Sequence, residues 1–150
     1  MFEPLNLQPA DLKISKRNGV FFVWDVWRNK SIQITPEEWV RQQLLHNMVD
    51  YFNYPLQRIA VEMQIEVNNL KRRCDAVIYD SDGRPKMIVE CKETNVVLNE
   101  AVVYQIAQYN AKLNTEWLMI SNGLHHITMR VKAEPFSCEF HEGIVDYNEL

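Results

Sequence analysis

The sequence predicts a mixed α/β domain built around one sheet, with a short β extension at its amino end. Two stretches repeat apolar residues at helical spacing, and several short stretches are apolar or alternating in the manner of strands. They follow one another as a helix, three strands, a second helix and two strands, an order typical of a mixed sheet covered by helices. A chain of 150 residues fits one such domain.

Residues 1–34 form the expected β extension. Residues 1–18 have the composition of a polar arm, and the aromatic and β-branched run Val20–Trp27 follows. A turn and alternating apolar residues come next, so residues 19–34 are expected to form a hairpin or an extended pair. The aromatic side chains could stack nucleic-acid bases, pack in the core or form a self-association surface.

The first helix is predicted to begin after Thr35. The sequence Thr35-Pro36-Glu37-Glu38 puts threonine at the N-cap, proline at the first helical position and Glu38 three residues after the cap, which is the pattern of a capping box. Apolar residues then recur at helical spacing, and the helix should end near Asn53 because a proline follows shortly.

Three strands are predicted after the first helix and two after the second. A strong turn at residues 80–85 joins the second strand to the third, and Asn99 is the expected N-cap of a second helix that runs to about Leu113. The predicted strands are residues 59–67, 74–79, 86–92, 117–121 and 125–131.

The net charge of −4 is unevenly distributed along the chain. Residues 1–34 carry five basic and three acidic side chains, whereas residues 133–150 carry five acidic side chains and no lysine or arginine. An acidic chain argues against nucleic-acid binding only when the whole surface is acidic. Here we expect an acidic tail at 133–150 behind a nearly neutral core at 35–132.

The three cysteines, Cys74, Cys91 and Cys138, are widely spaced and odd in number. This excludes a disulfide framework and a CxxC metal site, and it suits a reducing cytoplasm. No apolar run approaches the ~20 residues that span a bilayer, and the amino end lacks the basic and apolar segments of a secretory signal. We therefore expect a cytoplasmic protein with no membrane association.

The candidate chemistry lies between Asp75 and Lys92. Strand alternation puts Glu90 and Lys92 on one face and Cys91 on the other, and a hairpin about the turn sets Asp75 opposite Glu90 to within a residue or two. Facing carboxylates destabilise a strand pair unless something compensates their charge. Mg²⁺ is a natural candidate because it takes carboxylate oxygens and waters.

The candidate ligands of Mg²⁺ or Mn²⁺ are Asp75, Glu90 and the backbone carbonyl of Cys91. Lys92 could polarise or deprotonate a water, or neutralise charge that develops on a phosphate, so the layout suits metal-assisted phosphodiester hydrolysis. A solvated face with a weak Glu90–Lys92 pair is the alternative. The charges follow the apolar run 87–89, which reads as buried and favours a site.

These pieces together resemble a known nuclease signature. Asp75, a turn and Glu90-Cys91-Lys92 look like the PD-(D/E)XK motif, although Cys74 stands where that motif has proline, and Gln105 to Tyr109 looks like the QxxxY motif of its RecB-like branch. Over residues 35–132 the pattern resembles the N-terminal nuclease domain of type I restriction enzyme R subunits. The matching pieces are Glu38-Trp-Val-Arg41, Tyr54-Pro55, Glu62, Arg73-Cys-Asp75, Glu90-Cys-Lys92, Gln105, Tyr109-Asn110 and Ser121-Asn122-Gly123.

The resemblance implies a restriction endonuclease-like fold, in which helices flank a mixed sheet. It implies that Asp75 and Glu90 bind the metal and that Lys92 is the catalytic lysine. Glu38 would be an outer acidic residue near the metal. The capping box is the other interpretation of Glu38, and Glu37 is a rival for the acidic role.

The resemblance also implies contacts with nucleic acid. Gln105 and Tyr109, four apart on one helix face, would contact the DNA backbone or support the site, unless they form only a polar stripe. Lys71, Arg72 and Arg73 precede the Asp75 strand and could contact phosphates, with a solvated loop as the equal alternative.

The sequence thus predicts a Mg²⁺- or Mn²⁺-dependent DNA endonuclease domain related to the R-subunit N-terminal domains. The expected partners are DNA, together with a second copy of the chain or other restriction-modification subunits. A non-catalytic module of the same fold that binds DNA or a partner is the alternative hypothesis. A nuclease for RNA or repair intermediates is a third.

Overall fold

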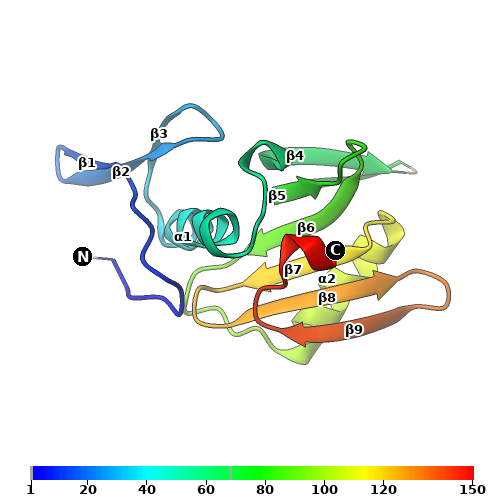
Figure 1. Cartoon of the computed structure of the whole chain (residues 1–150). Helices are drawn as coiled ribbons and strands as arrows, with labels where there is room; N and C mark the ends of the chain where they lie inside the picture. The colour runs from blue at the N-terminus through cyan, green and yellow to red at the C-terminus, as the bar shows by residue number, and fades with distance from the viewer. Residues whose placement is uncertain (1, 68) are drawn as a thin grey trace.

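The computed structural model describes residues 2–67 and 69–150, and the side chain of Val67 lies outside the described set. The alternation of apolar residues along 59–67 predicts Val67 on the apolar side of that strand, and this prediction lies outside the described residues. Within the described residues the fold is α+β, with two α-helices and two sheets (Figure 1). The elements are β1 (Ile14–Arg17), β2 (Val20–Asp25), β3 (Lys30–Gln33), α1 (Pro36–Tyr51), η1 (Leu56–Arg58), β4 (Ile59–Val67), β5 (Leu70–Tyr79), β6 (Pro85–Cys91), α2 (Glu100–Lys112), β7 (Trp117–Ser121), β8 (His126–Lys132), β9 (Ser137–Glu142) and η2 (Tyr147–Glu149).

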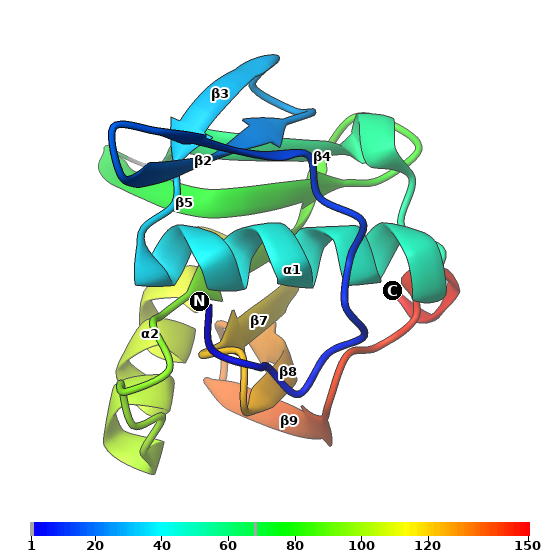
Figure 2. The same ribbon diagram turned by 90° about the vertical axis from the view of Figure 1, so that its left-hand side faces the viewer.

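The larger sheet has the strand order β4-β5-β6-β7-β8-β9. Neighbours pair antiparallel except β6 and β7, which are parallel and are joined through α2. Parallel neighbours need such a crossover because a tight turn cannot connect them. Figure 2 shows that α1 and α2 lie apart from each other beside this sheet. The prediction of a mixed α+β domain is confirmed.

An apolar layer covers each face of the larger sheet. β6 gives Met87 and Val89 to the layer that contains α1 and gives Ile88 to the layer that contains α2. Successive residues of a strand point to opposite faces, so this division is the predicted one. The α1 layer is filled by Leu44, Leu45 and Met48, and the α2 layer by Val103, Ala107 and Leu118.

α1 begins where the sequence predicts. The hydroxyl of Thr35 accepts a hydrogen bond from the Glu38 N–H at 3.1 Å, and the helix ends at Tyr51 with Phe52 as its C-cap. The second half of the predicted capping box is wrong, because the Glu38 carboxylate is turned away to Arg28. A charged partner from another element competes successfully with the local backbone donor.

The amino-terminal extension contains more structure than predicted. Ile14–Arg17, expected in a polar arm, is the strand β1 and pairs with β2 through a tight turn at Asn18 and Gly19. Both turn residues have positive φ, the conformation that two-residue hairpins require and that Asn-Gly supplies. The Asn-Gly pair was the available sequence signal.

Residues 2–10 cross α1 (Figure 2). The side chain of Gln43 accepts a hydrogen bond from the Ala10 N–H at 2.9 Å, and the side chain of Asn47 donates one to the Gln8 carbonyl at 2.7 Å. These bonds explain why α1 can bury polar residues on the side away from the large sheet.

The acidic carboxyl end also packs on the domain. Ser137–Glu142, predicted as part of a tail, is the edge strand β9 and pairs with β8. Beyond it the Val145 carbonyl accepts a hydrogen bond from the Tyr54 hydroxyl at 2.9 Å. No helix in the described ranges is both long enough and apolar enough to cross a membrane.

Candidate active site

The register of β5 and β6 brings two predicted carboxylates together. Ala76 pairs with Val89, and continuing the same register sets Asp75 opposite Glu90 as predicted. At this point Asp75 Oδ2 accepts a hydrogen bond from the Cys91 N–H at 2.7 Å. The side chain of Asp75 thus bridges the two strands where their paired residues end.

Arg41 of α1 holds the Asp75 side of the site. Its Nη2 lies 3.2 Å from Asp75 Oδ1, and its Nη1 lies 3.4 Å from Glu38 Oε2 and also contacts Glu62. The guanidinium is buried, and so is Glu38. Buried charges persist only when they are paired, and here one cation serves four carboxylates, since Arg41 Nη2 also lies 3.9 Å from Glu37 Oε1.

Arg72 of β5 holds the Glu90 side. Its Nη2 donates to Glu90 Oε1 at 2.6 Å, and its Nη1 donates to the side-chain oxygen of Asn110 on α2. The guanidinium also lies over the Tyr109 ring, 5.1 Å from the ring centre. Burial raises the pKa of Glu90, which Arg72 opposes and Asp75 reinforces.

Lys92 follows β6 and is anchored through its backbone, whose N–H donates to the Ser121 carbonyl at 2.8 Å. Its ammonium makes no hydrogen bond or ion pair with the side chains that the structure describes. Lys92 is near enough to Glu37 and Glu90 to lower the pKa of each. It is therefore a cation placed among acids with its donors uncommitted.

The two candidate acids of α1 have different surroundings. Glu38 is buried and is bonded to Arg28 and to the side chain of Gln42, which donates at 2.9 Å. Burial raises the pKa of Glu37, and the charge of Asp75 raises it further. Glu37, the alternative acid in the prediction, is thus near enough to Asp75 and Lys92 for their charges to shift its pKa.

The predicted nucleic-acid contacts divide into inner and outer residues. Arg72 points into the site, whereas Lys71 and Arg73 are exposed and each forms an ion pair with a glutamate of β4. Tyr109 donates from its hydroxyl to the Lys71 carbonyl at 2.6 Å, so it supports β5. Gln105 is exposed on α2.

No group of three or more His, Cys, Asp or Glu side chains suited to a metal ion occurs among the described residues. A magnesium site can be built from one or two carboxylates, since this ion usually keeps several waters. Asp75 and Glu90, together with the adjacent Cys91 carbonyl, are such a set of hard oxygen donors. The donor chemistry therefore fits Mg²⁺ or Mn²⁺.

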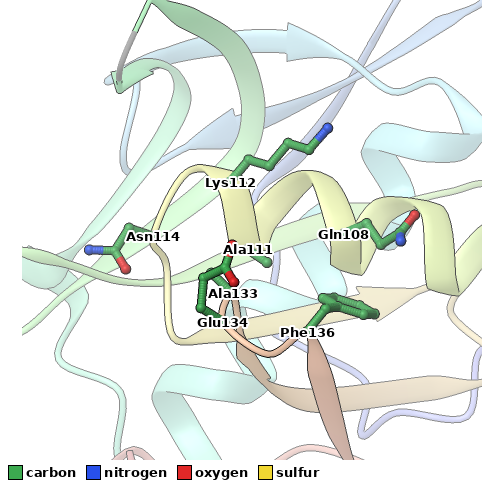
Figure 3. A pocket seen from close by; sticks show the side chains of 7 residues that line it. All are labelled: Gln108, Ala111, Lys112, Asn114, Ala133, Glu134 and Phe136. Carbon is green, nitrogen blue, oxygen red and sulfur yellow. The ribbon is translucent and has the colours of Figure 1, made fainter.

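A hollow at the carboxyl end of α2 contains none of the predicted site residues (Figure 3). It is lined by Gln108, Ala111, Lys112, Asn114, Ala133, Glu134 and Phe136. The candidate site is thus a cluster where the pairing of β5 with β6 ends, and it does not lie in this hollow.

Sequence reasoning missed Arg41 and Asn110 as site residues. Arg41 lies three and four residues after Glu38 and Glu37, a spacing that puts all three on neighbouring parts of one helix surface. Asn110 directly follows Tyr109. Helical spacing was thus the available signal for Arg41, whereas the bond to Asn110 depends on the approach of α2 to β5.

The candidate site lies within the segment of the chain that matches a known sequence family. A family model described as the type I restriction enzyme R protein N terminus matches residues 36–144. No curated protein and no solved structure matches the chain. The match begins at α1, continues past β9 and includes Asp75, Glu90 and Lys92. The chain belongs to the family of type I restriction enzyme R protein N-terminal domains.

Proposed function

We propose that this chain is a metal-dependent endonuclease domain that hydrolyses phosphodiester bonds in DNA, with the PD-(D/E)XK arrangement that its sequence resembles. The observation that carries the proposal is the gathering of Asp75, Glu90 and Lys92 where the pairing of β5 with β6 ends, beside the first turn of α1. Membership in a restriction-enzyme family supports the same chemistry.

In this proposal Asp75, Glu90 and the Cys91 carbonyl bind Mg²⁺ or Mn²⁺. When bound, such an ion supplies Lewis-acid stabilisation of phosphate charge and lowers the pKa of a water. Arg41 and Arg72 fix the two carboxylates in place, which reduces the rearrangement that ion binding requires.

Lys92 is the catalytic lysine of the proposed site. Its ammonium has no partner among the described side chains, so it can orient a water or neutralise charge that develops on the phosphate. The exposed Lys71, Arg73 and Gln105 lie on the neighbouring strand and helix, and we propose that they contact the DNA backbone.

A plasmid-nicking assay in Mg²⁺ and in Mn²⁺ tests the proposal. Asp75→Ala, Glu90→Ala and Lys92→Ala should each lower the cleavage rate by about 100-fold or more, the size expected for a group that acts in the transition state. Asp82→Ala and Lys132→Ala are matched controls, because both residues are exposed and remote from the cluster. Full activity in the first three variants would refute the nuclease.

The second candidate function is a binding module of the same fold that does not cut. One observation favours it: Arg41 and Arg72 already neutralise the two carboxylates without a metal ion. Calorimetry separates the two functions. Mn²⁺ binding that Asp75→Asn abolishes supports the nuclease, whereas DNA binding that is indifferent to the ion supports the module.

We propose DNA as the partner, with a second copy of the chain or other restriction-modification subunits as the assembly in which it works. The three cysteines are unpaired, which is compatible with the proposal of a reducing cytoplasmic environment.

A further inference from the structure

The sheet formed by β1, β2 and β3 has an outer face that the proposed active site does not use. Along β2, Val23 and Asp25 are buried, whereas Val20 and Trp24 are exposed and Phe22 is partly exposed. Alternate residues of a strand point to opposite faces. One face of this sheet is thus packed, and the other presents aromatic side chains to solvent.

Strand register identifies which residues share the exposed face. Arg17 is paired with Val20 on one side, and Gln33 is paired with Phe22 on the other. The Trp24 N–H donates to the Lys13 carbonyl at 2.9 Å, which places Lys13 beside Trp24. We call this surface the aromatic face. It consists of Lys13, Arg17, Val20, Phe22, Trp24 and Gln33.

The exposed charge on this part of the chain is positive. Residues 12–34 contain five lysines and arginines and one acid, Asp25, whose side chain is fully buried. The Arg17 guanidinium lies over the Phe22 ring, 5.3 Å from its centre. A chain with a net charge of −4 thus carries a surface on which two cations, Lys13 and Arg17, lie beside aromatic rings.

We propose that the aromatic face binds single-stranded nucleic acid. Trp24 and Phe22 stack on bases, and Lys13 and Arg17 contact phosphates, which is the combination that holds unpaired strands on protein surfaces. Bases of a duplex are stacked on one another and are closed to such rings. The unpaired strand is therefore the ligand that this chemistry fits.

The position of the sheet connects this surface to the proposed site. Asp25 accepts a hydrogen bond from Gln42 of α1 at 2.7 Å, and Arg28 contacts Glu38 in the first turn of that helix. The same turn carries Glu37, which interacts with Asp75. The packed face of this sheet thus contacts the helix that carries part of the candidate site, and a strand on the aromatic face would lie on the opposite side of the same sheet. Its binding requires no cleavage.

Fluorescence anisotropy with a labelled oligothymidylate tests the inference on the full chain in EDTA, where cleavage is blocked. Trp24→Ala should weaken binding about tenfold, the loss expected for one stacked base, and Trp24→Phe should restore most of it. Phe140→Ala is the matched control, because Phe140 is an aromatic residue 58% exposed on β9, away from β1–β3 (Figure 1). It should leave binding unchanged.

Salt dependence and a duplex competitor complete the test. Lys13→Ala should reduce the slope of binding against salt, since one phosphate contact is lost, and a duplex of equal length should compete poorly. Unchanged binding in Trp24→Ala would overturn the inference. A dimer that Trp24→Ala dissociates, with no oligonucleotide bound, would overturn it too and would identify a self-association face.

The outcome is separable from that of the proposed nuclease. Cleavage lost in Asp75→Ala with binding unaffected by Trp24→Ala would support the nuclease and overturn the strand-binding face. Binding that depends on Trp24, in a protein that cuts no DNA, would support the face alone.

Discussion

The register of β5 and β6 sets Asp75 opposite Glu90, but different parts of the molecule hold their side chains. Asp75 is paired with Arg41 of α1, and that arginine also contacts Glu38 and Glu62. Glu90 is paired with Arg72 of the neighbouring strand. The other side-chain partner of Arg72 is the uncharged amide of Asn110 on α2. One carboxylate thus belongs to a charged network, and the other belongs to a single pair.

The two arrangements differ in how they respond to loss of the arginine. The network extends from Asp75 through Arg41 and Glu38 to Arg28, which also pairs with Asp25 of the amino-terminal sheet. Each of these charges is therefore stabilised by several others. Glu90 can become uncharged instead. Burial already raises its pKa, so it can take up a proton when its partner is lost. Protonation of Glu90 can thus offset the loss of Arg72, whereas the carboxylates around Arg41 depend on the charge of that arginine.

The largest effect should come from Arg41→Met. This change removes the buried cation that Glu38, Glu62 and Asp75 share, and Asp75 has no second arginine among the described residues, so the free energy of unfolding should fall by about 3–5 kcal/mol. Urea denaturation at neutral pH measures it. Arg84→Met is the control, because Arg84 forms only exposed pairs in the turn, and it should cost under about 1 kcal/mol. Equal costs in the two variants would contradict the network.

Arg72→Met should have a smaller effect that depends on pH. The cost should be about 1–3 kcal/mol near neutral pH, where burial leaves Glu90 unsatisfied. A carboxyl group whose folded-state pKa is raised stabilises the fold fully below its unfolded pKa and loses that contribution as pH rises through the folded value. The variant should therefore be closer to wild type at pH 5 than at pH 8.

Urea denaturation of Arg72→Met in EDTA at both pH values checks this prediction. The Tyr109→Phe variant serves as a comparison, because it keeps the ring over Arg72 and removes only the hydroxyl bond to the Lys71 carbonyl. Its cost should be about 1 kcal/mol and insensitive to pH. A cost of Arg72→Met that is equal at both pH values would show that Glu90 does not respond by protonation.

The sequence could predict the strand pair that carries the site, because a strong turn and apolar alternation determine the register of a hairpin. The pairing of Ala76 with Val89 confirms that register. Charge compensation could not be predicted in the same way. Arg41 and Asn110 lie on helices whose approach to the sheet depends on packing over the whole domain.

The extensions at the two ends were less predictable than the core. β1 and β9 are short edge strands with many polar residues, so they lack the apolar signal that marks the central strands. Asn18-Gly19 is typical of a hairpin turn, but the predicted turn lay after Trp27 and residues 1–18 were expected to be a polar arm. In both places tertiary pairing outweighs local composition.

The smallest effect concerns the caps of the two helices. Thr35 accepts a hydrogen bond from Glu38 N–H on α1, and Asn99 accepts one from Val102 N–H on α2. Thr35→Ala and Asn99→Ala should each lower the free energy of unfolding by about 1 kcal/mol, since each leaves one helix-end donor unpaired. Chemical denaturation should find them alike, although α1 is central and α2 is more exposed.

Cleavage should separate the same two variants. Thr35 fixes the first turn of α1, which carries Glu37 toward Asp75, so its loss should slow nicking several-fold. Asn99 begins α2 at the end remote from Asn110, the residue that contacts Arg72. Asn99→Ala should therefore leave the nicking rate unchanged at equal stability. Equal rates in the two variants would mean that the first turn of α1 does not help to position the site.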